Sequence, residues 1–394
     1  MMEETPEHIS ETTPVIPDVS AVIIGRNGCS YLKKCLDSVK RAEPKFSEII
    51  YVDDASSDGS AAWVRRCHPE ARVIALEERK GPSHARNAGI AQARGPLVLL
   101  MDCDAYPAPS CAGLLAEKIA RSPQALLAVP KIILGGTDIV QHGGGRCHIL
   151  GMTVFQDAWG GTGRIGGHNL PFTSCGGSIM MVNKAVLPPD LRFDENMFFS
   201  CEDADFALGA AIRGMKVLYE PDATGHHGNE RLGAEFKGLV GYPREKIFYQ
   251  SRNRRWLILK NFELKTIILT FPLQLLFECA VFMLALGRGA SGEYLKSWLS
   301  FFSGLPAMLK ARKIAQSNRR IPDAGLLTSN DLSLRPSLTR FKTVIPISIL
   351  FNAVCRLWWS VVKSLTSESF PPRSEPEACC SRVLFLAPQP FYRL

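Results

Sequence analysis

The stretch "PLVLLMDCDA", residues 96–105, runs from five apolar residues into two aspartates, Asp102 and Asp104. A short apolar run after a glycine and a proline is typical of a buried strand, because parallel strands covered on both faces need not alternate polar and apolar residues. The aspartates then stand at the carboxyl end of the strand, which is the edge where open α/β sheets bind ligands. Because like charges this close repel each other, we expect a compensating cation, and a hard divalent metal ion with oxygen ligands is the first candidate.

Strand-like and helix-like patterns alternate on the amino-terminal side of this stretch. We expect strands at 19–25, 47–54 and 71–78, and helices at 30–42, 60–67 and 82–93. This rhythm is typical of parallel βαβ units with right-handed crossovers. From about residue 111 to residue 230 the chain is richer in glycine and proline, as expected for a substrate-facing extension with long loops.

Two further acidic clusters stand along the chain. Asp53 and Asp54 also end an apolar run, so we expect them at the same sheet edge as Asp102. Capping of the helix that follows at 60–67 is the alternative, but one side chain suffices for a cap and this loop has several. Glu202 and Asp203 follow an aromatic stretch, and apolar surroundings raise the pKa of a carboxyl group, as a general base requires.

Cationic and metal-ligating side chains accompany these clusters. Arg86 lies early in an expected helix, where free backbone N–H groups favour anions, and an arginine there suits a diphosphate. A solvent-facing arginine is the alternative. His226 and His227 form a pair that we expect in a loop, and His227 is a candidate third metal ligand beside Asp102 and Asp104. Two polar loop histidines are the alternative.

The composition of 46% apolar and 21% charged residues describes an ordinary folded protein with a net charge of +8. Residues 288–342 hold ten Lys and Arg against three acidic residues, which suits either a nucleic acid or an anionic membrane. The apolar neighbours of this segment favour the membrane, so we expect no nucleic-acid partner. Twelve cysteines without framework spacing indicate reduced thiols in a cytosolic compartment.

Two long apolar runs, residues 266–286 and 343–362, flank this basic segment. The first is long enough to cross a bilayer, and buried helices of a soluble domain are the alternative. Pro272 and Pro346 favour broken or re-entrant helices, and a basic loop stays on the cytoplasmic side. We therefore expect interfacial or re-entrant helices at the cell membrane, on its cytoplasmic face.

Several motifs resemble those of the family 2 glycosyltransferases, which use nucleotide-diphosphate sugars on a GT-A fold. The matching stretches are "AVIIGRNGCSYLKKCLDSV" (21–39), "IIYVDDASSDGS" (49–60), "GPSHARNAGIAQARGPLVLLMDCDA" (81–105) and "CEDADF" (201–206). They lie between residues 19 and 227, over half of the chain. The resemblance implies a Rossmann-like mixed α/β sheet with flanking helices, to which the apolar runs add membrane-associated helices at the C-terminus.

The resemblance also implies roles on the donor side of the site. Asp53 and Asp54 inherit contacts with the base and ribose of the nucleotide, and Arg86 matches an arginine on the nucleotide side. Asp102 and Asp104 form the D-x-D motif, which in the family binds the ribose and the divalent metal, Mg²⁺ or Mn²⁺, that bridges the diphosphate.

On the acceptor side the resemblance gives Asp203 the role of catalytic base, with Glu202 beside it, in an inverting direct displacement. The chain departs from the family pattern at residues 25–27 ("GRN") and at Gly209, where family members usually carry an arginine. "QSRNRRW" (250–256) has the wrong spacing for the Q-x-x-R-W motif of processive synthases. The rhamnosyltransferase-like members, which extend lipid-linked or surface polysaccharides, are the more similar group.

The resulting expectation divides the chain into a lead-in, a catalytic domain and a membrane-associated part. The boundaries are 1–18 for a disordered lead-in, 19–243 for the catalytic domain (19–110 nucleotide-binding, 111–243 acceptor half), 244–365 for the membrane-associated helices and 366–394 for a tail. The expected activity is transfer of a sugar from a nucleotide-diphosphate donor to a lipid-linked or glycan acceptor. A catalytically inactive, membrane-bound nucleotide-sugar binding protein is the alternative.

Overall fold

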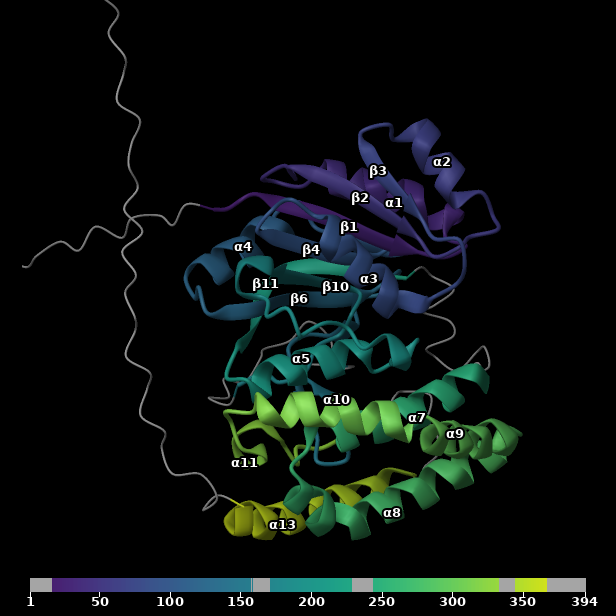
Figure 1. The fold of residues 1–394 in the computed structure, drawn as a ribbon, viewed down its shortest axis with the longest axis vertical. Coiled ribbons are helices and arrows are strands. Elements are labelled where there is room, and N and C mark those ends of the chain that lie inside the picture. Colours follow the sequence, from purple (N-terminus) through teal and green to yellow (C-terminus); the bar gives the residue numbers. More distant parts are fainter. Residues whose placement is uncertain (1–15, 157, 159–170, 229–243, 333–343, 367–394) are drawn as a thin grey trace, which may run out of the picture.

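The structure is a computed structural model that describes residues 16–156, 158, 171–228, 244–332 and 344–366 (Figure 1). The expected lead-in up to residue 15, the tail from residue 367 and residues 333–343 of the basic segment lie outside the described residues. The strands are β1 Val19–Gly25, β2 Glu48–Asp53, β3 Ala71–Ala75, β4 Leu97–Asp102, β5 Ala105–Pro107, β6 Ala125–Leu134, β7 Val140–His142, β8 Gly145–Cys147, β9 Thr153–Phe155, β10 Ile179–Asn183 and β11 Lys216–His227. The helices are α1 Cys29–Lys40, α2 Ser60–Cys67, α3 Gly81–Gln92, α4 Cys111–Ala120, α5 Glu202–Ile212, α7 Arg244–Asn261, α8 Leu264–Gly287, α9 Ser291–Ser303, α10 Leu305–Ser317, α11 Asp323–Leu326 and α13 Val344–Thr366, with 3-10 turns η1 Lys184–Val186 and η2 Glu195–Met197.

A nine-stranded mixed sheet forms the first layer of the molecule, in the order β3-β2-β1-β4-β10-β6-β11-β5 with β7 beside β6. Strands β1 to β4 are parallel, which confirms the expected βαβ units, and β10 enters antiparallel between β4 and β6. The register sets Gly25 opposite Asp53 and Ile24 opposite Asp102. The first two acidic clusters therefore lie at one edge of one sheet, as expected.

Strand β4 is apolar along its whole length because both of its faces are covered. Leu97, Leu99 and Met101 pack into a core with α1 and α4 on one side of the sheet. Val98 and Leu100 pack into a second core with α3 and α5 on the other side. The run of five apolar residues thus fills two cores at once, which explains why it does not alternate.

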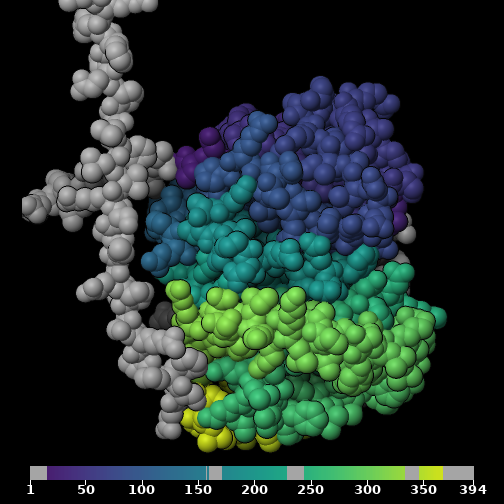
Figure 2. Space-filling view, viewed as in Figure 1, coloured from purple at the N-terminus to yellow at the C-terminus, as the bar shows by residue number. Residues whose placement is uncertain are grey.

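The carboxyl-terminal helices form a second body below the sheet, joined to it through α5 and α7 (Figures 1 and 2). Helices α8 and α13 lie side by side at the end of the molecule farthest from the sheet (Figure 1). The expectation of helices broken at their prolines is wrong. Helix α8 continues through Pro272, and Pro346 lies in the first turn of α13, where a helix tolerates proline. Helix α13 contacts α8 on both sides of the proline, since Trp358 Nε1 donates to the Leu269 carbonyl before it and Phe351 packs against Phe277 after it.

Large apolar side chains of these helices remain exposed, contrary to the alternative of buried helices in a soluble domain. We call this set the apolar face. Its members are Leu264, Ile268, Phe271, Leu275, Leu276, Met283, Leu284 and Leu286 on α8; Leu295, Leu299 and Phe302 on α9; and Ile347, Ile349, Leu350, Val354, Leu357, Trp358, Val361 and Leu365 on α13. Within the described part of the chain, α8 is the helix that is long and apolar enough to cross a membrane.

The close approach of α3 to the sheet predicts that Gly89 cannot be enlarged without cost. A Cβ atom there would collide with the Val22 side chain of β1. We expect Gly89→Ala to lower the free energy of unfolding by about 1–3 kcal/mol, the usual cost of overpacking. Denaturant unfolding measures it. The control Gly292→Ala meets no atom within 4 Å and should not destabilise the protein; equal stability of the two variants would contradict the packing argument.

Candidate active site

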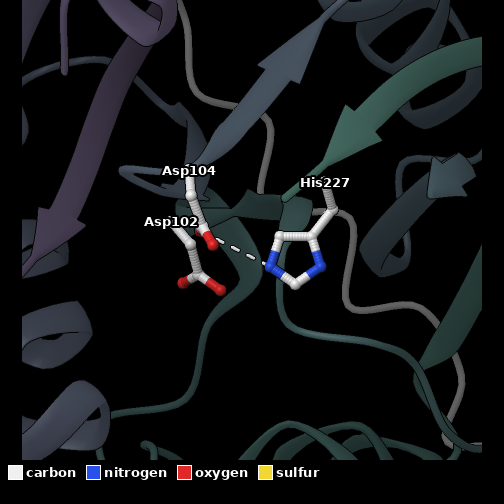
Figure 3. A group of neighbouring side chains, drawn as sticks. All are labelled: Asp102, Asp104 and His227. Carbon is white, nitrogen blue, oxygen red and sulfur yellow. Dashed lines mark ion pairs between the residues drawn. The ribbon is translucent and has the colours of Figure 1, made fainter. Parts of the chain in front are cut away.

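The ends of three strands bring Asp102, Asp104 and His227 together (Figure 3). Asp102 ends β4, Asp104 lies in the turn that follows, and β5 then pairs antiparallel with β11 so that Ala105 stands opposite His227. His227 Nε2 lies 3.4 Å from Asp104 Oδ1, and one ligand atom from each of the three residues lies within 4.8 Å of the others. Two carboxylates and an imidazole suit a divalent cation such as Mn²⁺ or Mg²⁺.

The two adjacent histidines have different surroundings. They end strand β11, so the expectation of a loop is wrong, and the alternation of a strand turns their side chains to opposite sides. His227 is held by Gln141, whose Oε1 lies 2.9 Å from Nδ1 and so orients the ring toward Asp104. Burial and the charge of Lys34 lower the pKa of His226, which takes no part in the cluster.

Each of the three clustered residues changes the pKa of at least one other. Burial raises the pKa of Asp102 to about 6, against the opposing charge of Arg86. Burial also raises the pKa of Asp104, but the hydrogen bond and the charge of His227 outweigh it and leave the pKa below its usual value. The pKa of His227 is raised in turn, because the contact with Asp104 exceeds the effect of burial.

Arg86 connects the carboxylate at the end of β4 to the carboxylate at the start of α5. Its side chain is buried, with 2% of the residue exposed, so the alternative of a solvent-facing arginine is excluded. Nη1 donates to Glu202 Oε1 at 2.8 Å, while Nη2 donates to Asp102 Oδ1 at 2.9 Å and to the Gly177 carbonyl at 3.1 Å. Arg86 is therefore one of the cations that compensate the carboxylates at this edge.

The acidic residues at the start of α5, Glu202, Asp203 and Asp205, have different surroundings. Glu202 is buried against Arg86, and Asp205 is buried against Lys260, whose Nζ lies 2.7 Å from Asp205 Oδ2. Asp203 is half-buried and has no such cationic partner among the described residues. Burial raises the pKa of Asp203 to about 7, and the charge of Glu202 adds to the effect. A carboxylate with this pKa is suited to accept a proton near neutral pH.

Gly177 is a site residue that sequence analysis missed. A Cβ atom on it would stand 2.9 Å from Arg86 Nη2 and 3.2 Å from Asp203 Oδ2, so any larger residue would crowd both groups. The adjacent glycines of "CGGS" (175–178) were the available signal. They lie in an irregular part of the sequence, and only the tertiary structure brings Gly177 against α3 and α5.

Asp53 and Asp54 both stand at the sheet edge, but they differ in their contacts. Asp54 accepts the backbone N–H groups of Lys80 at 2.7 Å and Gly81 at 3.0 Å, and thereby caps α3. Asp53 accepts the Tyr51 hydroxyl at 3.0 Å. Capping of α2 was the alternative role for this pair, but the N-cap residue of α2 is Gly59, and the carboxylate that accepts the Ser60 N–H, at 3.0 Å, is that of Asp58.

Comparisons with known proteins agree with this geometry. The sequence model of "Glycosyl transferase family 2" matches residues 20–185. The chain is 37% identical over 90 residues to the succinoglycan biosynthesis protein ExoO of Rhizobium meliloti (strain 1021), covering 23% of this chain and 26% of that protein. It is 33% identical over 104 residues to ExoU of the same organism, covering 26% of this chain and 30% of that protein. The matched segments thus span less than a third of each relative.

A solved structure shows the same fold. The structure of GalNAc-T7 with UDP, GalNAc and Mn²⁺ superimposes with a TM-score of 0.50 at 17% sequence identity, covering 66% of this chain and 51% of that one. This likeness confirms the mixed α/β sheet of the GT-A type. The matched family model, the similar relatives and the D-x-D edge point the same way: residues 20–185 of this chain match the sequence model of glycosyl transferase family 2.

Proposed function

We propose that this protein is an inverting glycosyltransferase that moves a sugar from a nucleotide-diphosphate donor to an acceptor hydroxyl. The observation that carries the proposal is the separation of roles at one sheet edge. Asp102, Asp104 and His227 form a cluster fit for a cation, while Asp203 has a raised pKa and lies near the buried Arg86, on the other side of Gly177, without forming an ion pair in the described structure. One part of the edge suits the diphosphate and the other suits proton removal.

The donor would lie across the carboxyl ends of β1, β2 and β4. Asp53 and Asp54 are proposed to contact its base and ribose, Asp102 the ribose, and Asp104 with Asp102 and His227 the metal. These last three residues would hold a divalent ion, Mg²⁺ or Mn²⁺, whose positive charge would stabilise the departing diphosphate. Arg86, held between Asp102 and Glu202, adds fixed positive charge on the nucleotide side.

Asp203 is proposed to be the catalytic base. It removes the proton of the acceptor hydroxyl as that oxygen attacks the anomeric carbon from the face opposite the diphosphate. The new carbon–oxygen bond forms while the bond to the diphosphate oxygen breaks, and the nucleoside diphosphate leaves with the electron pair. A single displacement of this kind inverts the anomeric configuration. Glu202 is unsuited to the role, because its Oε1 is already paired with Arg86.

The acceptor is proposed to be a lipid-linked or polysaccharide chain at the cytoplasmic face of the cell membrane. The relatives named for succinoglycan biosynthesis support a glycan acceptor. The apolar face supports a membrane location, and the basic residues between α8 and α13 suit anionic headgroups on the cytoplasmic side. Glu278 of α8 does not oppose this placement, because it is buried against Arg254 and Arg255 inside the helical body.

The metal cluster predicts that Asp104 is required for cation binding. Asp104→Asn removes the charge of a ligand oxygen, and we expect the affinity for Mn²⁺ to fall by about 10-fold or more. Titration of Mn²⁺ followed by electron paramagnetic resonance measures this directly. Asp37→Asn, an exposed carboxylate paired with Lys33, changes net charge equally and should bind Mn²⁺ as the wild type does. Unchanged affinity in Asp104→Asn would exclude the proposed ligand set.

The proposed base predicts a separation of chemistry from donor binding. We expect Asp203→Asn to lower kcat by about 100-fold or more, the scale of a lost general base, while the donor affinity stays nearly constant. Release of nucleoside diphosphate from UDP-glucose, UDP-N-acetylglucosamine, GDP-mannose and dTDP-rhamnose measures turnover and identifies the donor. Parallel losses of donor affinity and rate would make Asp203 a binding residue.

The pH profile provides a control within the same experiment. A base accepts a proton only when it is deprotonated, so a pKa near 7 makes wild-type kcat rise with pH between about 6 and 8. This rise should be absent in Asp203→Asn. The alternative of an inactive nucleotide-sugar binding protein predicts donor binding without turnover at any pH.

The apolar face predicts binding to lipid vesicles. Leu275→Glu on α8 and Leu357→Glu on α13 would place charge in the apolar layer, and we expect the double variant to lose about 100-fold or more of its affinity for vesicles. Flotation with vesicles of phosphatidylethanolamine and phosphatidylglycerol measures it. Ile314→Glu on α10, outside the apolar face, is the matched control.

The proposed location also predicts that the segment between α8 and α13 lies on the cytoplasmic side of the membrane. A cysteine introduced at exposed Ser303 should resist an impermeant maleimide in intact cells and react after lysis. Strong labelling of intact cells would place the segment between α8 and α13 outside and restore a two-span arrangement.

A further inference from the structure

The turn that carries Glu202 and Asp203 into the site has an unusual backbone. Phe198, Ser200 and Cys201 have φ values of 50°, 72° and 69°, although none of them is glycine. Residues with a Cβ atom rarely adopt positive φ values, and such backbone conformations persist only where the surrounding structure enforces them. Helix α5 begins directly after this turn, so the conformation of the turn determines where the two carboxylates stand.

One side chain of α7 is placed to enforce the conformation. Asn253 is fully buried, and its Nδ2 lies 2.6 Å from the Met197 carbonyl oxygen, 2.8 Å from that of Phe199 and 2.6 Å from that of Ser200. An amide has two N–H groups, so these three acceptors share them. Asn253 Oδ1 is fixed in turn, because it accepts Arg252 Nε at 2.9 Å.

A second contact from the same helix supports this arrangement. Arg252 Nη2 donates to the carbonyl of Asn196 at 3.0 Å and to that of Met197 at 3.3 Å. Carbonyl groups of this turn that do not take part in helix or strand hydrogen bonds thus accept hydrogen bonds from α7 instead. Buried carbonyls without partners would destabilise the turn, so the contacts and the backbone conformation depend on each other.

We propose that Asn253 is a positioning residue for the reaction: its amide holds the turn at residues 197–201 in the conformation that presents Asp203 to the acceptor. This inference rests on the proposed role of Asp203 as base. Asn253 itself touches neither the carboxylate nor the strand edge, and it acts only through the backbone of the turn.

Cys201 reports on the turn without any requirement for activity. It is the last residue of the turn and is half-buried, and burial of its thiol, with the charge of Asp203, raises the pKa of the thiol to about 12. A thiol with this pKa reacts slowly, and release of the turn would expose it further. Cys67, which is exposed on α2, serves as the internal reference.

The experiment compares the full-length protein with Asn253→Ala, using N-ethylmaleimide and peptide mass spectrometry. We expect the alkylation rate of Cys201 to rise by about 10-fold or more and that of Cys67 to stay constant. With the donor that the nucleotide-sugar panel identifies, we expect kcat to fall by about 10- to 100-fold while the donor KM stays within about two-fold. An unchanged Cys201 rate, or a wild-type kcat with an exposed Cys201, would overturn the inference.

Gln316 of α10 offers a matched control. Its Nε2 donates to three carbonyls at the end of α7, those of Lys260 at 3.1 Å, Asn261 at 3.0 Å and Phe262 at 3.5 Å. Gln316→Ala therefore removes an equivalent set of contacts far along the same helix, and Cys201 should keep its wild-type rate. An equal rise in both variants would show a general loss of stability and contradict the specific role.

Asn253→Asp covers the case in which the alanine variant does not fold. It keeps the size and the oxygen that accepts Arg252 Nε but loses the N–H groups, so it should expose Cys201 as alanine does. A wild-type Cys201 rate in folded Asn253→Asp would overturn the inference. Because the thiol measurement needs no substrate, a protein without transferase activity would refute the proposed function separately from the role of Asn253.

Discussion

The site depends on one buried guanidinium. Arg86 contacts a carboxylate at the end of β4 and another at the start of α5, and these carboxylates are Asp102 and Glu202. Two carboxylates at the same edge repel each other, and burial also removes part of their hydration. A cation between them offsets both effects. The arginine therefore joins the nucleotide half of the sheet to the helix that carries Asp203. It also leaves Asp203 as the carboxylate of that helix with a raised pKa and no cationic side chain paired to it in the described structure.

Helix α7 has a corresponding role between the two bodies of the molecule. Toward the sheet, Asn253 and Lys260 contact the turn before α5 and the carboxylate of Asp205. Toward the opposite side, Arg254 and Arg255 pair with Glu278 of α8, the helix that carries much of the apolar face. The polar sequence around residue 250, which looked like a displaced synthase motif, is thus largely buried. Its charged residues make internal contacts that fix the sheet domain to the helices that carry the apolar face.

These two connections give the protein a plain physical organisation. The proposed donor is soluble, whereas the proposed lipid-linked acceptor would stay at the bilayer surface, so the proposed reaction needs a donor site and a membrane surface in fixed relation. The sheet edge and the apolar face lie in different bodies of this chain, and α5 and α7 connect them (Figure 1). At the turn before α5, a side chain of α7 contacts the segment that leads to the proposed base.

Local sequence was sufficient for the parallel half of the fold. Residues 97–101 could be interpreted as a buried strand because an apolar run of that length between turn signals has few other solutions, and the flanking patterns repeated at βαβ spacing. That also placed Asp53 and Asp102 at one edge, since parallel strands end together. The D-x-D motif and its resemblance to a known family pointed to the candidate metal and base residues before any coordinates.

The tertiary structure decided the contacts between distant segments. Arg86 was expected at a diphosphate, but its partners are 16 and 116 residues away along the chain, and no local pattern encodes which carboxylate a guanidinium will meet. Asn253 had no signal of its own, and the paired glycines around Gly177 did not indicate a role, because a glycine or an asparagine acquires a function only from what packs against it. The unbroken α8 likewise followed from its neighbours, whose packing outweighs the one hydrogen bond that Pro272 removes. The sequence determined the strands and helices of the parallel half and which of their residues are apolar, because hydrophobic periodicity and turn chemistry act over a few residues. Only the fold determined which charges compensate one another, because that depends on groups brought together across the whole chain.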